Sequence, residues 1–215
     1  MNVLALDGAL GAFSAAVARD EQIAVARAEA GNVALERGLA IADEVLARAG
    51  LRPERIDRLA VGIGPGGFTG LRIAIAYAKS LAAVWQRPLV AIDSFDLLEY
   101  GGGFERVLAV VVGRPGVISA RYRSATEMRR ASGWTEEVLD AVLPSGGGEL
   151  EVVGAPKDVL HALAERAIIV RSAQPVVTPA AAAAALAASS REPARSVHEV
   201  RADYGELPAA KSPRF

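Results

Sequence analysis

The sequence predicts a duplicated α/β fold with two lobes, of which the second is reduced. Three features of the 215 residues lead to this expectation. The first half reads as strand-strand-strand-helix-strand-helix-strand, a glycine-rich bend joins its fourth strand to an apolar helix, and a second hairpin begins after Gly101–Gly103. Strands alternating with helices in this way are typical of sheets that helices cover.

The first three strands are predicted from apolar runs at residues 3–6, 13–18 and 22–28. The links between them are short, so we expect antiparallel hairpins. Asp7 lies in the first link, where a carboxylate can accept hydrogen bonds from turn amides. In a kinase or an ATPase, Asp7 would instead help to hold magnesium, but the Gly113 turn offers no second carboxylate, so the turn-forming role is favoured.

A helix is expected over residues 33–49, with Asn32 as its N-cap and Gly50 after its last turn. Apolar residues at helical spacing form one stripe on this helix, and charged residues occupy the opposite face. The helix should therefore cover a sheet with one side and face solvent with the other.

The stretch from Leu59 to Trp85 is the centre of the sequence. It predicts a buried strand over residues 59–63, a glycine-rich bend, and a helix from about Gly70 that Thr69 would cap. Such a bend either cradles a phosphate group or needs glycine for tight geometry. No lysine follows Gly70, as the P-loop pattern requires, and the match to the dinucleotide-binding spacing is weak, so the structural interpretation is favoured.

The helix over residues 70–85 is apolar nearly all round, with a thin polar edge at Arg72, Lys79 and Ser80. A helix of this kind is buried on more than one side. One side can pack on the sheet of its own lobe, and we expect a second protein chain to cover the other.

The second half predicts strands at residues 107–112, 117–122, 151–153 and 168–170, and helices at 156–167 and 180–188. Residues 124–148 are expected to be irregular, and the polar residues 196–215 to lie on the surface or to reach a partner. The two lobes are placed at residues 1–100 and 101–215. This order of elements is the layout of the class that contains actin, the sugar kinases and the heat-shock chaperone ATPases.

Composition narrows the function classes. Hydrophobic residues make up 52% of the chain, which allows a sizeable core, and the formal net charge of −1 argues against broad nonspecific binding to nucleic acid or acidic membranes. The absence of cysteine, of a signal peptide and of an apolar run of membrane-spanning length leads us to expect a cytoplasmic protein that binds no membrane. His161 and His198 are far apart in sequence, so no metal site is expected.

The residues Gly64 to Ile73 read Gly-Pro-Gly-Gly-Phe-Thr-Gly-Leu-Arg-Ile. This run resembles the Gly-Pro-Gly-Ser-Phe-Thr-Gly-Leu/Val-Arg-Ile signature of the bacterial TsaB (YeaZ) family. The leading strand with Asp7, the end of the first helix at residues 43–51, and residues 57–62 are similar to the same family in order and spacing. The resemblance is strong over residues 1–98 and faint beyond them.

The resemblance implies a non-catalytic subunit in the formation of threonylcarbamoyladenosine, a tRNA modification beside the anticodon. Its implied partners are the catalytic subunit TsaD and the ATPase TsaE, with a homodimer as an alternative for the isolated chain, and tRNA would be contacted only indirectly. The two N-terminal helices are implied to form the dimer interface. The residues expected there are Leu35, Leu39, Leu46, Leu71, Arg72, Ala74, Ile75, Ala78, Leu81 and Ala82.

The sequence departs from the family pattern in three places. Gly8–Ala9 replaces the usual Thr-Ser/Ala, residues 33–35 replace the usual His-Ser/Thr, and Gly113–Arg114 replaces the usual Asp-Ala-Arg. These changes remove polar groups that could meet a nucleotide, so no tightly bound cofactor is expected and ATP would be handled by the partner subunits. The remaining cofactor-binding candidates are Asp7, Gly8, Gly66 and Gly67.

Two further expectations stay open. The main alternative function is a small ATP-dependent kinase or ATPase of the actin-like class, and a self-associating module without a role in RNA modification is another. A cluster of arginines at residues 121, 123, 129 and 130 either faces solvent or touches tRNA, and the solvated face is favoured because aromatic residues are scarce around it.

Overall fold

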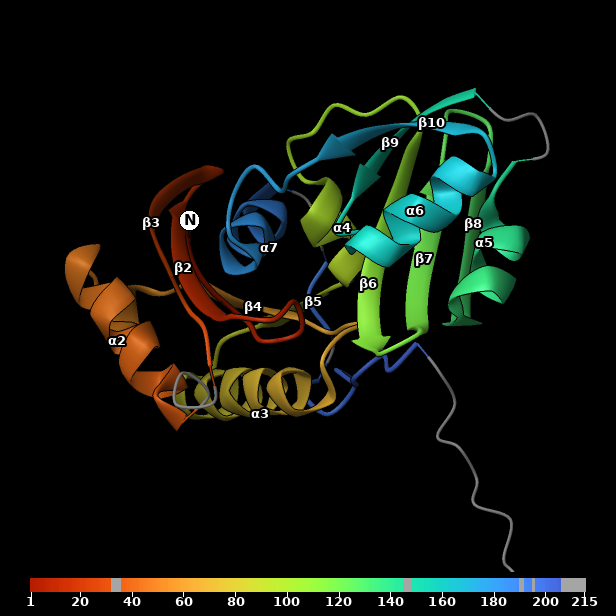
Figure 1. Cartoon of the computed structure of the whole chain (residues 1–215). Coiled ribbons are helices and arrows are strands. Elements are labelled where there is room, and N and C mark those ends of the chain that lie inside the picture. Colours follow the sequence, from red (N-terminus) through yellow and green to blue (C-terminus); the bar gives the residue numbers. More distant parts are fainter. Residues whose placement is uncertain (32–35, 145–147, 190–191, 195, 206–215) are drawn as a thin grey trace, which may run out of the picture.

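The computed structural model of the chain contains two five-stranded sheets that lie side by side as two lobes (Figure 1). It describes residues 1–31, 36–144, 148–189, 192–194 and 196–205. The strand orders are β3-β2-β1-β4-β5 in the first sheet and β10-β9-β6-β7-β8 in the second. Each sheet consists of three antiparallel strands followed by two strands that add in parallel at one edge. The same arrangement occurs twice, so the duplicated α/β fold class that the sequence predicted is confirmed.

The first sheet is built by apolar strands joined by short links. Its strands are β1 (Asn2–Asp7), β2 (Phe13–Arg19), β3 (Gln22–Glu29), β4 (Arg58–Gly62) and β5 (Leu89–Ile92). The hairpins predicted between the first three strands are present, with Leu4 opposite Val17 in the register of β1 and β2. β4 then adds parallel to β1 and β5 parallel to β4, as helical connections between strands require.

Helices cover both faces of this sheet. Alternate side chains of a strand point to opposite faces, so Leu4 and Leu6 face α2 (Gly38–Arg48) and α3 (Phe68–Trp85), while Val3 and Ala5 face α7 (Pro179–Ser189). The alanines of α7 are buried on this sheet, because their small side chains let the helix approach the strands closely. The expected range 101–215 for the second lobe therefore needs amendment, since α7 returns to the first sheet.

The second sheet follows after α4 (Ser94–Glu99). Its strands and helices are β6 (Val107–Arg114), β7 (Val117–Arg123), β8 (Met128–Trp134), α5 (Thr135–Val142), β9 (Gly148–Val153), α6 (Lys157–Glu165) and β10 (Ile168–Ala173). The helices α5 and α6 pack on one face, and Phe95 and Leu98 of α4 pack on the other. The second sheet is thus joined to the first lobe through α4.

The structure corrects several expected boundaries and caps. Residues 124–144 were expected to be irregular, but β8 and α5 lie there. β8 was missed because it is an edge strand whose side chains are only exposed or half-buried, so its sequence carries little apolar signal. α3 begins at Phe68, and Thr69 does not cap it, since Thr69 lies inside the first turn. Asp93 caps α4, accepting a hydrogen bond from the Phe95 amide at 2.8 Å. The expected cap Asn32 lies outside the described residues.

Candidate functional site: the glycine turn and the outer face of α3

The glycine turn packs tightly against the chain that leaves β1. A Cβ atom on Gly8 would lie 2.5 Å from the carbonyl oxygen of Gly70, and one on Gly66 would overlap with the carbonyl oxygen of Ala9. The Gly67 amide donates a hydrogen bond to Ala9 O at 2.8 Å. Because backbone atoms already fill the concave side of the turn, these contacts favour the structural interpretation of the glycines.

Asp7, the first cofactor-binding candidate, is sealed under this turn. Its side chain has no exposed surface, and Oδ1 accepts a hydrogen bond from the Leu10 amide at 3.4 Å. Oδ2 has no hydrogen-bond partner among the described residues, and a Cβ atom on Gly62 would overlap with it. Burial raises the pKa of Asp7 to about 7, although hydrogen bonds from the backbone of Leu10 and Ala9 act in the opposite direction. The turn-forming role agrees with this geometry.

The other cofactor candidates take part in the same packing. Gly8 contacts the start of α3, and Gly66 and Gly67 rest on Ala9. Among the described residues no group of three or more His, Asp or Glu side chains is placed to hold a metal ion. None of the described helices has the length and apolar character to cross a membrane.

α3 buries one side and exposes the other. Leu71, Ala74 and Ala78 are fully buried on the sheet, whereas Val84 is 78% exposed and Phe68 is 56% exposed. The solvent-facing side carries a row of small, mostly apolar residues that we call the outer stripe; it consists of Ala76, Ala83 and Val84 together with Ser80 of the polar edge. One side of α3 is therefore buried within the chain, as expected. The second side, which carries the outer stripe, is not covered by the described residues of the isolated protein.

This arrangement corrects part of the expected interface. Six of the residues expected there are buried in the chain's own core and are closed to a partner in this fold: Leu46, Leu71, Ala74, Ile75, Ala78 and Ala82. The expectation was based on apolar spacing. On a helix that is apolar nearly all round, this spacing is the same on the side that faces the core and on the side that faces outward, so it does not tell them apart. Leu39 is 46% exposed, Arg72 is exposed and Leu81 is half-buried. Leu35 lies outside the described residues.

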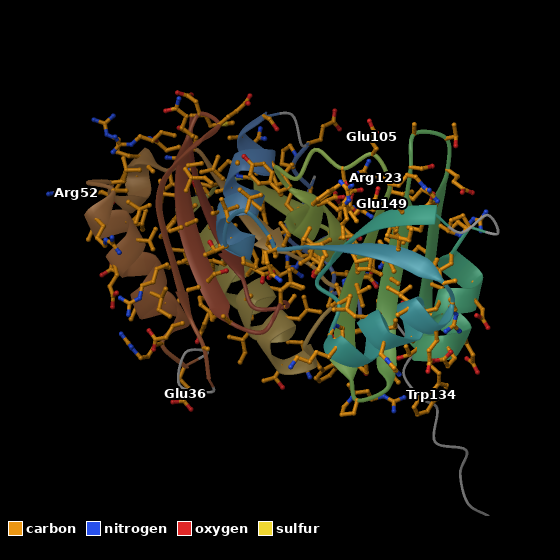
Figure 2. All side chains as sticks on the ribbon, turned by 45° about the horizontal axis from the view of Figure 1, so that its top comes forward. Glu36, Arg52, Glu105, Arg123, Trp134 and Glu149 are labelled. Carbon is orange, nitrogen blue, oxygen red and sulfur yellow. The ribbon has the colours of Figure 1, made fainter. Side chains whose placement is uncertain are left out.

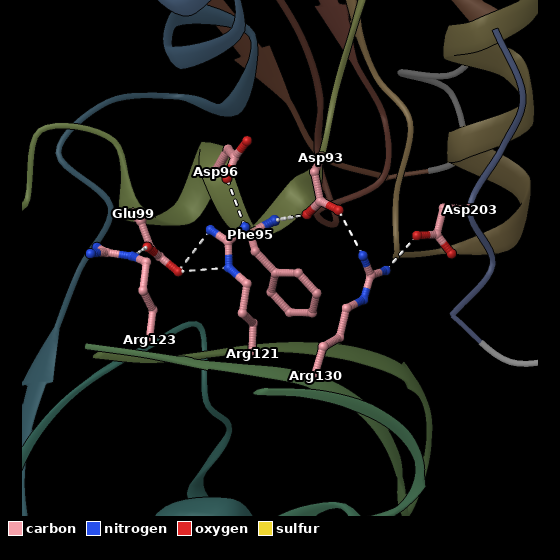
Figure 3. A network of polar contacts seen from close by, with 8 residues as sticks. All are labelled: Asp93, Phe95, Asp96, Glu99, Arg121, Arg123, Arg130 and Asp203. Atoms are coloured by element: carbon pink, nitrogen blue, oxygen red, sulfur yellow. Dashed lines mark hydrogen bonds and ion pairs between the residues drawn. The ribbon is translucent and has the colours of Figure 1, made fainter. Parts of the chain in front are cut away.

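The arginine cluster of the second lobe is neither a solvated face nor a free cationic surface. Arg121 lies between the lobes with its side chain 11% exposed, and it bonds Asp96 at 2.7 Å and Glu99 at 2.9 Å (Figure 3). Arg123 bonds the same Glu99 at 2.6 Å. Arg129 pairs with Glu127 at 2.8 Å. These carboxylates neutralise the arginines, and the pairs of Arg121 and Arg123 tie β7 to α4.

Arg130 extends the network to the C-terminal segment, which we define as residues 196–205. Its guanidinium donates to Asp93 at 2.9 Å and to Asp203, and it lies over the ring of Phe95 (Figure 3). The Asp203 amide also donates a hydrogen bond to Ile63 O at 2.7 Å. The segment is thus fixed both to β8 and to the strand end that leads into the glycine turn.

The C-terminal segment was expected to lie on the surface or to reach a partner; nine of its ten residues are exposed or half-buried, but the tenth, Val200, is a core residue. Val200 is 2% exposed and packs with the helices and strands of the first lobe. The Asp203 carbonyl lies so close to Gly64 that a Cβ atom there would overlap with it. The ring of Tyr204 lies 5.1 Å from that of Phe68. Two valines among polar residues are too weak a signal to predict this packing from sequence.

Comparison with known proteins identifies the family. A model of the family described as TsaD: tRNA N6-adenosine threonylcarbamoyltransferase matches residues 29–144, more than half of the chain. The tRNA threonylcarbamoyladenosine biosynthesis protein TsaB of Escherichia coli is 30% identical over 147 residues, which cover 66% of this chain and 62% of that protein. The tRNA N6-adenosine threonylcarbamoyltransferase of an Anaeromyxobacter species is 41% identical over 56 residues, 26% of this chain and 17% of that enzyme.

The aligned parts therefore span less than two thirds of the length of these curated relatives. Among solved structures, YeaZ from Pseudomonas aeruginosa superposes with a TM-score of 0.72 at 24% identity, covering 94% of this chain and 99% of that one. At that identity the likeness shows the shared fold. The family match over residues 29–144 and the similarity to TsaB of Escherichia coli show that the chain belongs to the TsaB (YeaZ) and TsaD group of threonylcarbamoyladenosine proteins.

Proposed function

We propose that the chain is a non-catalytic subunit of the complex that forms threonylcarbamoyladenosine in tRNA, and that it pairs with a TsaD-type catalytic subunit. The observation that carries the proposal is the outer stripe of α3, an apolar helix face left uncovered next to α2 in a chain of this family. Apolar surface exposed over a helix marks an interaction site when it exceeds scattered single residues.

The similarity to the transferases supports the choice of partner. The family model that matches residues 29–144 is that of TsaD itself, and this range holds both α2 and α3. Two chains that share these helices can pair through equivalent faces about an approximate twofold axis, with each outer stripe buried against the other. Leu39 of α2 is 46% exposed and Leu81 of α3 is half-buried, and both would extend the buried area.

The catalytic role is assigned to the partner because Asp7 is withdrawn from solvent. Its carboxyl group is fully buried, and a Cβ atom on the neighbouring Gly62 would overlap with its Oδ2. The Gly113 turn of the second lobe carries no carboxylate that could replace it. An ATP-dependent kinase or ATPase would require such a group at one of these two places. A TsaE-type ATPase is the proposed third component.

Co-purification with a TsaD-type protein tests the proposal. Val84→Asp and Ser80→Arg place charges on the outer stripe and should weaken the complex at least about tenfold, since burying an unpaired charge in an interface is costly. Val176→Asp is the matched control, because Val176 is also exposed, to 64%, but lies outside α3. Full binding by both outer-stripe variants would refute the interface. ATP turnover by the purified chain alone would refute the non-catalytic assignment.

A further inference from the structure

Two hollows share Arg72 and Ala76 of α3 in their linings; one lies between α3 and the C-terminal segment, and the other is lined by α3 alone. One has a volume of about 450 Å³ and is lined by Arg72, Lys79, Arg201 and Tyr204 among others. The other, of about 350 Å³, is lined by Phe68 and again by Arg72. We call them together the cationic groove. In Figure 1 the dark-blue C-terminal segment runs beside one end of α3, where it forms the second wall of this groove.

The charge of the cationic groove is one-sided. Arg72 and Lys79 stand two helical turns apart on the same side of α3, and Arg201 faces them from the C-terminal segment. Among the residues that the structure describes, no acidic side chain lines either hollow. None of the three cations has a carboxylate partner among the described residues, whereas Arg121, Arg123 and Arg130 are all paired. The groove therefore presents positive charge in a protein whose formal net charge is −1.

Two exposed aromatic rings stand at one end of the cationic groove. Phe68 is 56% exposed and Tyr204 is 42% exposed, and their ring centroids lie 5.1 Å apart at an interplanar angle of 32°. The Arg72 guanidinium lies over the Phe68 ring, 5.0 Å from its centroid. Unpaired cations that line a groove with exposed aromatic faces are the elements with which proteins bind single-stranded nucleic acid.

We propose that the cationic groove binds RNA, with backbone phosphates on Arg72, Lys79 and Arg201 and an unstacked base against Tyr204. The inference rests on the proposed function, whose substrate is a tRNA, and it replaces the expected indirect contact with a direct one. An acidic protein segment is less well matched, because its carboxylates offer no aromatic face to the two rings. Ala76 of the outer stripe lines both hollows, so the groove adjoins the proposed partner site. On the helical wheel Arg72 and Lys79 lie on the side of the outer stripe that faces away from α2, and Arg201 and Tyr204 come from the C-terminal segment.

Direct binding of an unmodified tRNA transcript to the full chain tests the proposal. In the combined variant Arg72→Gln/Lys79→Gln/Arg201→Gln, affinity at low salt should fall at least about tenfold, and the salt dependence of log K should flatten by about two units. The matched control is Arg48→Gln/Arg52→Gln/Arg55→Gln, which removes the same charge from exposed arginines of the first lobe. Arg52 marks that outer edge in Figure 2. The control should change affinity less than twofold; equal effects of the two variants would overturn the proposal.

A second variant pair tests the aromatic contact. Tyr204→Ala should weaken binding of a single-stranded oligoribonucleotide by at least about fivefold, because one base loses its stacking partner. Trp134→Ala is the control, since Trp134 is 54% exposed on the second lobe (Figure 2). If polyglutamate displaces the RNA at equal charge concentration and Tyr204→Ala has no effect, the groove is an acidic-protein site and the RNA proposal fails. The outer-stripe variants distinguish the two proposals. If they lose binding to the TsaD-type partner but keep binding to RNA, the RNA site and the partner interface are independent, and one proposal can fail without the other.

Discussion

Gly8 and Gly70 lie in direct backbone contact, so that a Cβ atom on Gly8 would stand 2.5 Å from the carbonyl oxygen of Gly70. The contact seats the end of β1 against the first turn of α3. It places the glycine turn in the core packing of the first lobe.

Gly8→Thr should therefore destabilise the protein, although it restores the residue usual in the family. The added Cβ must displace the backbone of α3, and overpacking of this kind costs about 1–3 kcal/mol. Urea unfolding of the purified chain measures the change. Gly113→Ala is the control, because a Cβ at Gly113 would have its nearest neighbour, Val117 O, at an ordinary 3.7 Å. Equal stability of Gly8→Thr and wild type would contradict the tight contact.

Asp7 should make stability depend on pH. Its folded-state pKa of about 7 lies above the ordinary value of 3.8, so the folded state holds a proton that the unfolded state has lost between these pH values. The stability that the neutral carboxyl group contributes is complete below about pH 4 and is lost as the pH rises toward 7, by a few kcal/mol in total.

Asp7→Asn removes this dependence, since the amide has a similar shape and does not titrate. Unfolding measured at pH 5 and pH 8 should show wild type losing stability relative to the variant at the higher pH. All other titrating groups are common to both proteins, so they cancel in the difference. A difference that stays constant from pH 5 to pH 8 would rule out a raised pKa.

Arg130→Gln should loosen the C-terminal segment. The substitution leaves the carboxylates of Asp93 and Asp203 without their shared partner, and because these side chains are 24% and 35% exposed, we expect a global loss of only about 1 kcal/mol. The local effect should be larger, with faster hydrogen exchange of the Asp203 amide that bonds Ile63 O. Arg171→Gln, in the exposed pair with Glu149, is the control. Unchanged protection at Asp203 would show that Arg130 does not hold the segment.

Ala78→Glu and Val84→Glu should separate the two sides of α3 in the isolated chain. Ala78 is fully buried, so a carboxylate there should cost more than about 3 kcal/mol or prevent folding. Val84 is 78% exposed, and its substitution should change stability by less than about 0.5 kcal/mol. Thermal unfolding of both variants measures this. Similar melting temperatures would mean that the helix is turned differently on the sheet.

The strands and helices of the first lobe could be predicted because each leaves a local mark. Short apolar runs with brief links predicted the hairpins of β1, β2 and β3, and the mostly apolar run after Thr69 predicted α3. β8 escaped prediction, since Met128–Trp134 is an edge strand with little burial and no clear alternation of apolar residues. Its pairing with β7 depends on a neighbour rather than on its own composition.

By itself the sequence determined the fold class, the family and the presence of one helix with more apolar surface than a single sheet face can cover. Only the tertiary structure decided which residues of α3 face inward, because an all-apolar helix gives no preferred side until a sheet is placed against it. It alone paired Arg121, Arg123 and Arg130 with acidic partners between 22 and 73 residues away. It also brought Val200 and Tyr204 onto α3, since contacts between distant segments depend on the path of the chain and leave no local pattern.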